Sequence, residues 1–227
     1  MVNPNHIKWN NQQQALRQAL KHPEDHERTI QLFLDHHAMV HSAVMSGSGL
    51  WSFEDEIWKG LTEKHIRKIP SGGEHSIAWI FWHLTRIEDV TMNLLLAGRP
   101  QLFIQEEWLD WLGIPFRDTG NAMSGADVVI LSDKINIDAL RSYRIAIGRR
   151  TRENVMRLPV SHLTQKVEPA RLKRVIAEGA VVEEARGVLE YWGGLTYAGL
   201  LLMPPTRHNF IHLNEALRVK KKVAGRG

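Results

Sequence analysis

The sequence predicts an all-α protein, specifically a four-helix bundle whose long connections contain short extra helices. Four long segments, near residues 26–46, 74–97, 137–158 and 204–220, carry apolar residues at the spacing of an amphipathic helix. By contrast, no alternation of apolar and polar residues is long enough for a sheet, since residues 128–131 form the only short β-like run. Helices that each bury one apolar stripe pack together, and four of them in one chain indicate a bundle.

Length and composition limit the domain organisation and the compartment. The chain has 227 residues and no linker rich in Pro, Gly or Ser, so we expect one domain over residues 26–222, flanked by a poorly ordered segment 1–25 and a tail 223–227. The absence of cysteine excludes disulfides and Cys-based metal or nucleophile sites, and it fits a reducing cytosol. The N-terminus lacks the apolar core of a secretory signal, and no apolar run is long enough to span a bilayer. We therefore expect a cytoplasmic protein without a membrane segment.

Local signals mark the starts of the long helices. The second has Ser71 and Glu74 at the spacing of a capping box, and the third begins after Asn136, a favoured N-cap residue. The fourth opens with Pro204 and Pro205, which fit a first turn because its N–H groups have no partner in the helix. The inward stripes contain, in chain order, Ile30, Phe33, Leu34, Ile77, Ile80, Leu84, Ile87, Leu140, Tyr143, Ile147, Phe210, Leu213 and Leu217.

Short helices are predicted in the connections. Ser52 and Asp55 fit a capping box for a helix that ends near Gly60, and Ser124 fits the start of another. Further short helical segments are expected near residues 106–112, 170–177, 182–192 and 195–203.

The charge pattern gives little support for nucleic-acid binding. The net charge is +4, and much of the excess lies in Lys220, Lys221 and Lys222 near the end of the chain. The third helix carries many arginines on its outer face, but Asp138 and Glu153 lie on the same helix, and aromatic residues do not alternate with the basic ones. A mild basic excess is typical of a solvated surface, so we expect no nucleic-acid partner.

Histidine spacing indicates a metal site. His208 and His212 are four residues apart on the fourth helix and Glu215 follows three residues later, so the three side chains share one helix face. The pair alone is a weak signal, because a chain with 12 histidines acquires such pairs by chance. His83, however, lies within the apolar arc of the second helix, and inward side chains of facing helices converge in a bundle. Three imidazoles would hold one divalent metal and leave positions open for water or substrate.

At these residues the chain resembles the DinB-like or YfiT-like metal-binding four-helix bundles of the DinB superfamily. The resemblance lies in residues 76–89 (SIAWIFWHLTRIED) and 206–215 (TRHNFIHLNE). In that family the second helix gives one histidine and the last gives an HxxxH pair, which correspond here to His83, His208 and His212. Many members carry a further histidine on the second helix, where this chain has Ile80, so the resemblance implies no role for that extra histidine here.

The resemblance implies a cytosolic homodimer that binds nickel or zinc and acts on a small molecule. Related bundles are thiol S-transferases, thiol-dependent isomerases or hydrolases. We expect metal-dependent thiol transfer, and since the chain has no cysteine, the sulfur would come from a low-molecular-weight thiol. A metal-dependent hydrolase and a non-catalytic, stress-associated metal-binding protein are the alternatives.

Two further residues are candidates for proton transfer. Glu215 can act as general base, orient a ligand imidazole, or pair on the surface with Arg207 or Arg218. His41, four residues after His37 on the first helix, can serve as a base or a fourth ligand, or lie at the edge of the bundle. The sequence leaves these roles open.

Overall fold

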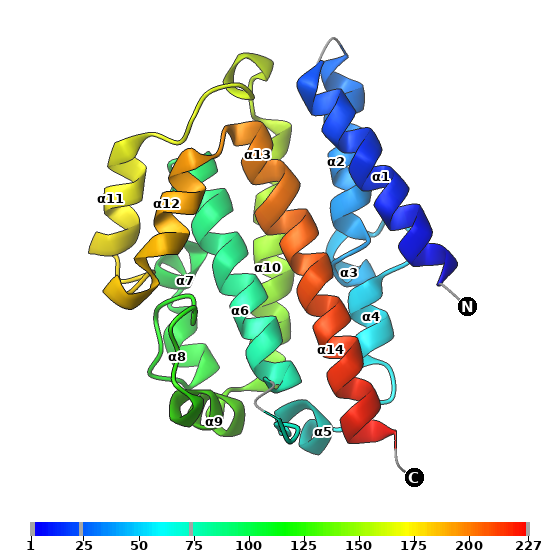
Figure 1. Cartoon of the computed structure of the whole chain (residues 1–227), viewed down its shortest axis with the longest axis vertical. Coiled ribbons are helices and arrows are strands. Elements are labelled where there is room, and N and C mark those ends of the chain that lie inside the picture. Colours follow the sequence, from blue (N-terminus) through cyan, green and yellow to red (C-terminus); the bar gives the residue numbers. More distant parts are fainter. Residues whose placement is uncertain (1–2, 23–24, 73–74, 226–227) are drawn as a thin grey trace.

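The computed structural model of the protein describes residues 3–22, 25–72 and 75–225. Within these ranges the regular structure is helical, and the only β-type pairing is an isolated antiparallel bridge between Lys166 and Thr196 (Figure 1). The all-α prediction is therefore confirmed. The helices are α1 (Pro4–Lys21), α2 (His26–Ala38), α3 (Ala43–Ser46), α4 (Phe53–Trp58), α5 (Glu63–Arg67), α6 (Ile77–Asp89), η1 (Val90–Leu96), α7 (Leu102–Gln105), α8 (Trp108–Leu112), α9 (Gly125–Lys134), α10 (Ile137–Met156), η2 (Val160–His162), α11 (Pro169–Ala177), η3 (Glu183–Ala185), α12 (Arg186–Gly194), α13 (Tyr197–Leu202), η4 (Met203–His208) and α14 (Asn209–Ala224).

The bundle is built from α2, α6, α10 and α14, as the four long amphipathic segments predict. The central helix α6 packs against α10 and α14, and α2 packs against α10 and η4 (Figure 1). Every residue of α6 is buried, which is the property of a helix surrounded by others on all sides. Among the helices that the structure describes, none has both the length and the apolar character needed to cross a membrane.

The core of the bundle consists of two apolar clusters with buried polar side chains between them. On α10, Ile147 belongs to one cluster and Val155 to the other, and the buried Thr151 lies between them. On α2 the buried His37 likewise lies between members of the two clusters. Burying polar side chains in a core is unfavourable unless they are hydrogen-bonded, so a protein that buries a layer of them indicates a functional site at that layer.

The predicted caps of several helices are present. The Ser52 side chain accepts a hydrogen bond from the Asp55 N–H, the Ser124 side chain from the Asp127 N–H, and Asn136 caps α10 in the same way. The capping box expected for the second long helix includes Glu74, which lies outside the described residues. The described helix α6 is capped by Ser76, whose side chain accepts from the Trp79 N–H.

The first long helix differs from the predicted 26–46, because it is interrupted after Ala38 and resumes as α3. In the interruption, the carbonyl of Val40 accepts a hydrogen bond from Arg144, and the carbonyl of His41 accepts one from the Ser52 hydroxyl. These side chains take the place of helical N–H donors, so the chain leaves the helix without losing its backbone hydrogen bonds.

The N-terminal segment is the main correction to the predicted fold. We expected residues 1–25 to be poorly ordered, but Pro4–Lys21 form α1, which packs against α2 and α13. Asn3 caps this helix, and its buried face includes Trp9, Leu16 and Leu20. Trp9 stacks on Phe210 of α14 with ring centroids 3.8 Å apart. The helix is polar overall, and this one narrow stripe holds it on the bundle.

The last helix also differs from prediction. Pro204 and Pro205 were expected in a first turn, but they lie within the π-helical segment η4, which joins α13 to α14 into one continuous rod (Figure 1). Proline cannot donate the usual helical hydrogen bond, and a wider turn is one way in which a helix accommodates it. The rod therefore begins before the prolines, at Tyr197, and ends at Ala224.

Candidate metal centre

Three histidines meet at the seam between α6 and the rod that ends in α14. His83 comes from α6, His208 from the end of η4 and His212 from the first turn of α14, and one ring nitrogen of each lies within 4.8 Å of the other two. The ring centroid of His83 is 5.2 Å from that of His208 and 5.0 Å from that of His212. The structure thus brings together the three residues that the sequence singles out, although His83 is far from the others along the chain.

The orientation of His83 is fixed by its own helix and by one loop. Its Nδ1 is 2.5 Å from the carbonyl oxygen of Thr119, so the proton must be on Nδ1 and the lone pair on Nε2. The indole of Trp79, one turn earlier on α6, stacks on the imidazole at 4.8 Å and 9°. Burial lowers the pKa of His83 to about 3, so the ring is neutral at physiological pH and free to bind a metal.

The orientation of His212 is fixed by Glu215. The carboxylate accepts a hydrogen bond from His212 Nδ1 at 2.7 Å and another from His75 Nδ1 at 3.0 Å. Burial raises the pKa of Glu215, but the hydrogen bonds from His212 and His75 outweigh it and lower the pKa to about 2. Of the roles that the sequence left open for Glu215, this arrangement favours orienting an imidazole, and its partners are histidines instead of Arg207 or Arg218.

His208 supplies an unsatisfied polar atom at the same place. Its Nδ1 is buried and has no hydrogen-bond partner in the described part of the chain. Burial lowers the pKa of His208 well below its usual value, so this ring too is neutral. The Nδ1 atoms of His37 and His41 are likewise buried without a partner among the described residues, so it is the convergence with His83 and His212 that marks His208 as a candidate metal ligand.

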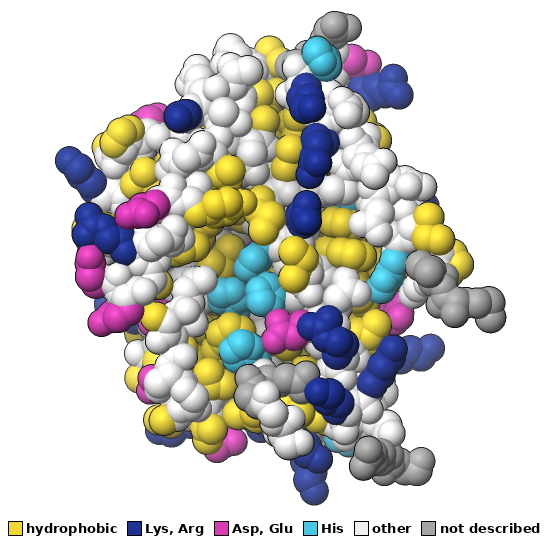
Figure 2. Space-filling view, viewed as in Figure 1, with side chains coloured by type: hydrophobic (Ala, Val, Ile, Leu, Met, Phe, Trp, Pro, Cys, Tyr) yellow, Lys and Arg dark blue, Asp and Glu magenta, His cyan; other side chains and the backbone are white. Residues whose placement is uncertain are grey.

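The three side chains fit a divalent transition metal. Neutral imidazoles suit zinc and nickel, and the carboxylate of Glu215 occupies the outer position typical of histidine sites. Figure 2 shows histidine side chains gathered in the middle of one face, over the seam between α6 and α14, and the His212 side chain is 20% exposed. The group can therefore hold a divalent metal that remains accessible to small molecules.

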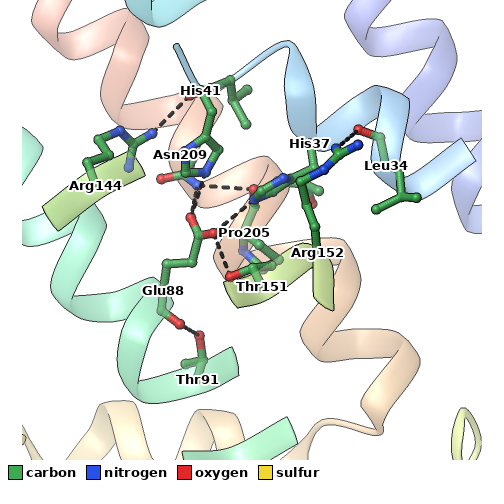
Figure 3. A network of polar contacts seen from close by, with 12 residues as sticks. Leu34, His37, His41, Glu88, Thr91, Arg144, Thr151, Arg152, Pro205 and Asn209 are labelled. Carbon is green, nitrogen blue, oxygen red and sulfur yellow. Dashed lines mark hydrogen bonds and ion pairs between the residues drawn. The ribbon is translucent and has the colours of Figure 1, made fainter. Parts of the chain in front are cut away.

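A second cluster lies deeper, and the sequence did not predict it. His37 and His41 donate from Nε2 to the two oxygens of Glu88 at 2.8 and 2.9 Å (Figure 3). Thr151 donates to Oε1 and Asn209 to Oε2 of the same carboxylate, both at 2.8 Å. His41, a candidate base or fourth ligand, thus belongs to this cluster and lies outside the group formed by the three histidines of the seam.

The charged residues of α6 are buried, although charged side chains usually lie on a solvated face. Glu88 and Asp89 are fully buried, and Arg86 pairs with Asp89. A sequence signal was available: apolar residues surround α6 on every side, so this helix has no solvent-facing stripe to which charges could belong.

Comparison with known families agrees with the architecture. The model of the DinB superfamily matches residues 54–186, which is more than half of the chain. The matched span contains His83 and Glu88 and ends before His208 and His212. No curated protein matches the sequence. On the strength of the family match, the chain belongs to the DinB superfamily.

Proposed function

We propose that this protein is a metal-dependent enzyme that holds one nickel or zinc ion with His83, His208 and His212. The observation that carries the proposal is the convergence of three imidazoles, one ring nitrogen of each lying within 4.8 Å of the others. Thr119 and Glu215 hold the Nδ1 protons of two of them, which leaves the Nε2 lone pairs available. No carboxylate belongs to the described group, so a metal bound there retains positions for substrate.

The proposed chemistry is transfer of a small thiol to an electrophile. A bound metal supplies one thing, a lowered pKa for a coordinated thiol or water, so that the nucleophile is ionised at neutral pH. The chain contains no cysteine, so the thiol is a low-molecular-weight cosubstrate. The ring of Trp79 lies between those of His75 and His83 and stacks on both, so this side of the site is aromatic.

Glu215 and His41 are better placed to position the site than to move protons. A carboxylate with a pKa of about 2 is a poor proton acceptor at neutral pH. His41 is fully buried, is hydrogen-bonded to Glu88, and lies outside the group formed by the three histidines at the seam. We therefore assign Glu215 the orientation of His212 and give neither residue a proton-transfer role.

Metal analysis of single-histidine variants tests the metal centre. His83→Ala should lose most bound nickel or zinc, as should His208→Ala, although the two residues lie on different helices. His22→Ala is the matched control, because this exposed histidine lies beyond the end of α1 and away from the seam. Full metal occupancy in His83→Ala, with loss in His208→Ala, would refute a site shared by the two helices.

Activity assays separate transfer from the alternatives. Metal-loaded and metal-free protein are incubated with a low-molecular-weight thiol and a panel of electrophiles, and thiol consumption is followed. Dependence on both the metal and the three histidines supports transfer. Cleavage of ester or amide substrates without thiol consumption supports a hydrolase, and metal binding without any turnover supports a non-catalytic protein.

A further inference from the structure

The buried cluster around Glu88 ties together all four helices of the bundle. Glu88 comes from α6, His37 from α2 and His41 from the segment after it, Thr151 from α10 and Asn209 from α14. We call these five residues the Glu88 network (Figure 3). Each carboxylate oxygen accepts two hydrogen bonds, and none of the five residues is more than 1% exposed.

The network contains one negative charge held by neutral donors. Burial lowers the pKa of His37 and lowers that of His41 to about 3, so both imidazoles are neutral and donate from Nε2. Burial alone would raise the pKa of Glu88, but its interactions with His41 and His37 outweigh that effect and lower the pKa well below its usual value. A carboxylate with four donors is stable as an anion even in a dry core.

A second metal ion does not suit the Glu88 network. For His37 and His41 to bind metal through Nε2, their protons would have to move to Nδ1. Both Nδ1 atoms are buried and have no partner in the described part of the chain, so each would become an unsatisfied donor. Two of the three histidines at the seam, His83 and His212, donate from the ring nitrogen that would not bind the metal, as metal-binding histidines usually do, whereas neither His37 nor His41 does so within the described residues.

The Glu88 network reaches the metal centre through Asn209, the residue after His208. The Asn209 amide donates to Glu88 Oε2 at 2.8 Å and to the Pro205 carbonyl at 3.0 Å. The second bond spans the end of η4, so the amide fixes the turn from which His208 projects. Glu88 itself lies five residues after His83 on α6. One carboxylate therefore connects the two helices that supply all three histidines.

The α2 side of the network is also fixed. Arg144 donates to the Val40 carbonyl at 2.9 Å, and Arg152 donates to the Leu34 carbonyl at 2.7 Å (Figure 3). Both arginines belong to α10, so that helix holds in place the backbone that carries His37 and His41.

We propose that Glu88 is a positioning residue for the metal centre: its carboxylate fixes Asn209, and through it the ring of His208. This inference rests on the proposed metal-binding function. Among the described contacts, the Glu88 carboxylate forms no hydrogen bond with His83, His208 or His212, so it acts through Asn209.

The test compares metal affinity in three variants. Asn209→Ala and Glu88→Gln should each weaken Ni²⁺ and Zn²⁺ binding by about 10–100-fold, the usual effect of losing a group that orients a ligand. Thr151→Val is the matched control, because it removes a donor from the same carboxylate without touching Asn209, and its dissociation constant should stay within about threefold of wild type. Circular dichroism confirms that each variant is folded, and Asn209→Ala carries the test if Glu88→Gln does not fold.

The absorption spectrum of the Co²⁺-substituted protein reports the geometry of the metal site. A general loss of protein stability would not shift its bands. The ligand-field bands should shift in Asn209→Ala and Glu88→Gln and stay unchanged in Thr151→Val. Wild-type metal affinity and an unchanged spectrum in Asn209→Ala would refute the positioning role of Glu88 and leave the proposed metal-binding function standing. A loss of metal affinity in Thr151→Val as large as that in Asn209→Ala would do the same. Failure of the wild-type protein to bind any of these metals would refute the proposed function, and the positioning role with it.

Discussion

Gly120→Ala is expected to destabilise the protein and to weaken its metal centre, although Gly120 has no side chain that could bind a metal. Gly120 follows Thr119, whose carbonyl accepts the hydrogen bond from His83. Its φ angle is +78°, in the left-handed region, and a Cβ built on it would lie 2.5 Å from Cζ3 of Trp82. The Trp82 ring is fully buried and rigid, so it cannot turn away as a flexible side chain would.

Backbone strain and overpacking together set the loss of stability in Gly120→Ala. A residue with a Cβ in the left-handed region costs about 1–2 kcal/mol. Carbon atoms prefer separations of about 3.5–4.0 Å, so the ring or the loop must move by about 1 Å, and overpacking of this kind costs about 1–3 kcal/mol. The sum is about 2–5 kcal/mol, which for a chain of this size lowers Tm by about 4–20 °C.

Gly49→Ala measures the cost of backbone strain without the cost of overpacking. Gly49 also has a positive φ angle, +69°, but a Cβ there would have no atom within 4 Å, so only the backbone term of about 1–2 kcal/mol applies. Denaturant unfolding of both variants, with metal titration of the folded proteins, measures the difference. Gly120→Ala should also weaken metal binding, because the Thr119 carbonyl moves from His83. Equal stability losses in the two variants, or wild-type metal affinity in Gly120→Ala, would refute this reasoning.

Three further predictions concern acid stability, helix packing and association. Burial lowers the pKa of His36 and of His41 to about 3, whereas both titrate near 6.5 in the unfolded chain, which therefore binds more protons in acid. These two histidines alone should lower the free energy of unfolding by up to about 2.7 kcal/mol per pH unit from about pH 6 toward pH 4, and the other buried histidines add to this fall. A urea midpoint unchanged between pH 7 and 5 would contradict this prediction. Gly148→Ala should lower the free energy of unfolding by about 1–3 kcal/mol, because the added Cβ would lie 2.7 Å from Met45 and 2.9 Å from His41. This loss should outweigh the better helix propensity of alanine. Urea unfolding measures it, and a variant more stable than wild type would contradict the prediction. We expect a homodimer, so sedimentation at micromolar concentration should give twice the chain mass of 26.0 kDa, and a monomer mass would exclude it.

The sequence predicted those features that depend on residues close together in the chain. Ser52, Ser124 and Asn136 cap their helices because each side chain reaches an N–H group only three residues away. The apolar stripes of the long helices were also predictable, because their residues recur every three or four positions along the chain. The helix α1 was missed because most residues in its sequence are polar. Contacts with α2 and α13 stabilise this helix more than the helix propensity of its own residues does.

The site was predictable only in part. His208 and His212 share a helix face, and His83 interrupts an apolar arc, so all three carry a sequence signal. Thr119 does not, because it contributes a backbone carbonyl that any residue could offer. Glu88 was missed because its partners come from three other helices, and charge alone does not tell a buried anion from a solvated one.

The π-helical segment η4 has a consequence for how this site can change over evolutionary time. A π turn contains one residue more than the α turn that it replaces. The wider turn therefore accommodates one additional residue without changing the phase of the helix beyond it, so His208 and His212 keep the orientation relative to α13 that a regular helix one residue shorter would give them. A histidine pair beyond such a turn can stay directed at α6 when one residue is gained or lost in residues 203–206, because the turn can widen or tighten to absorb the change.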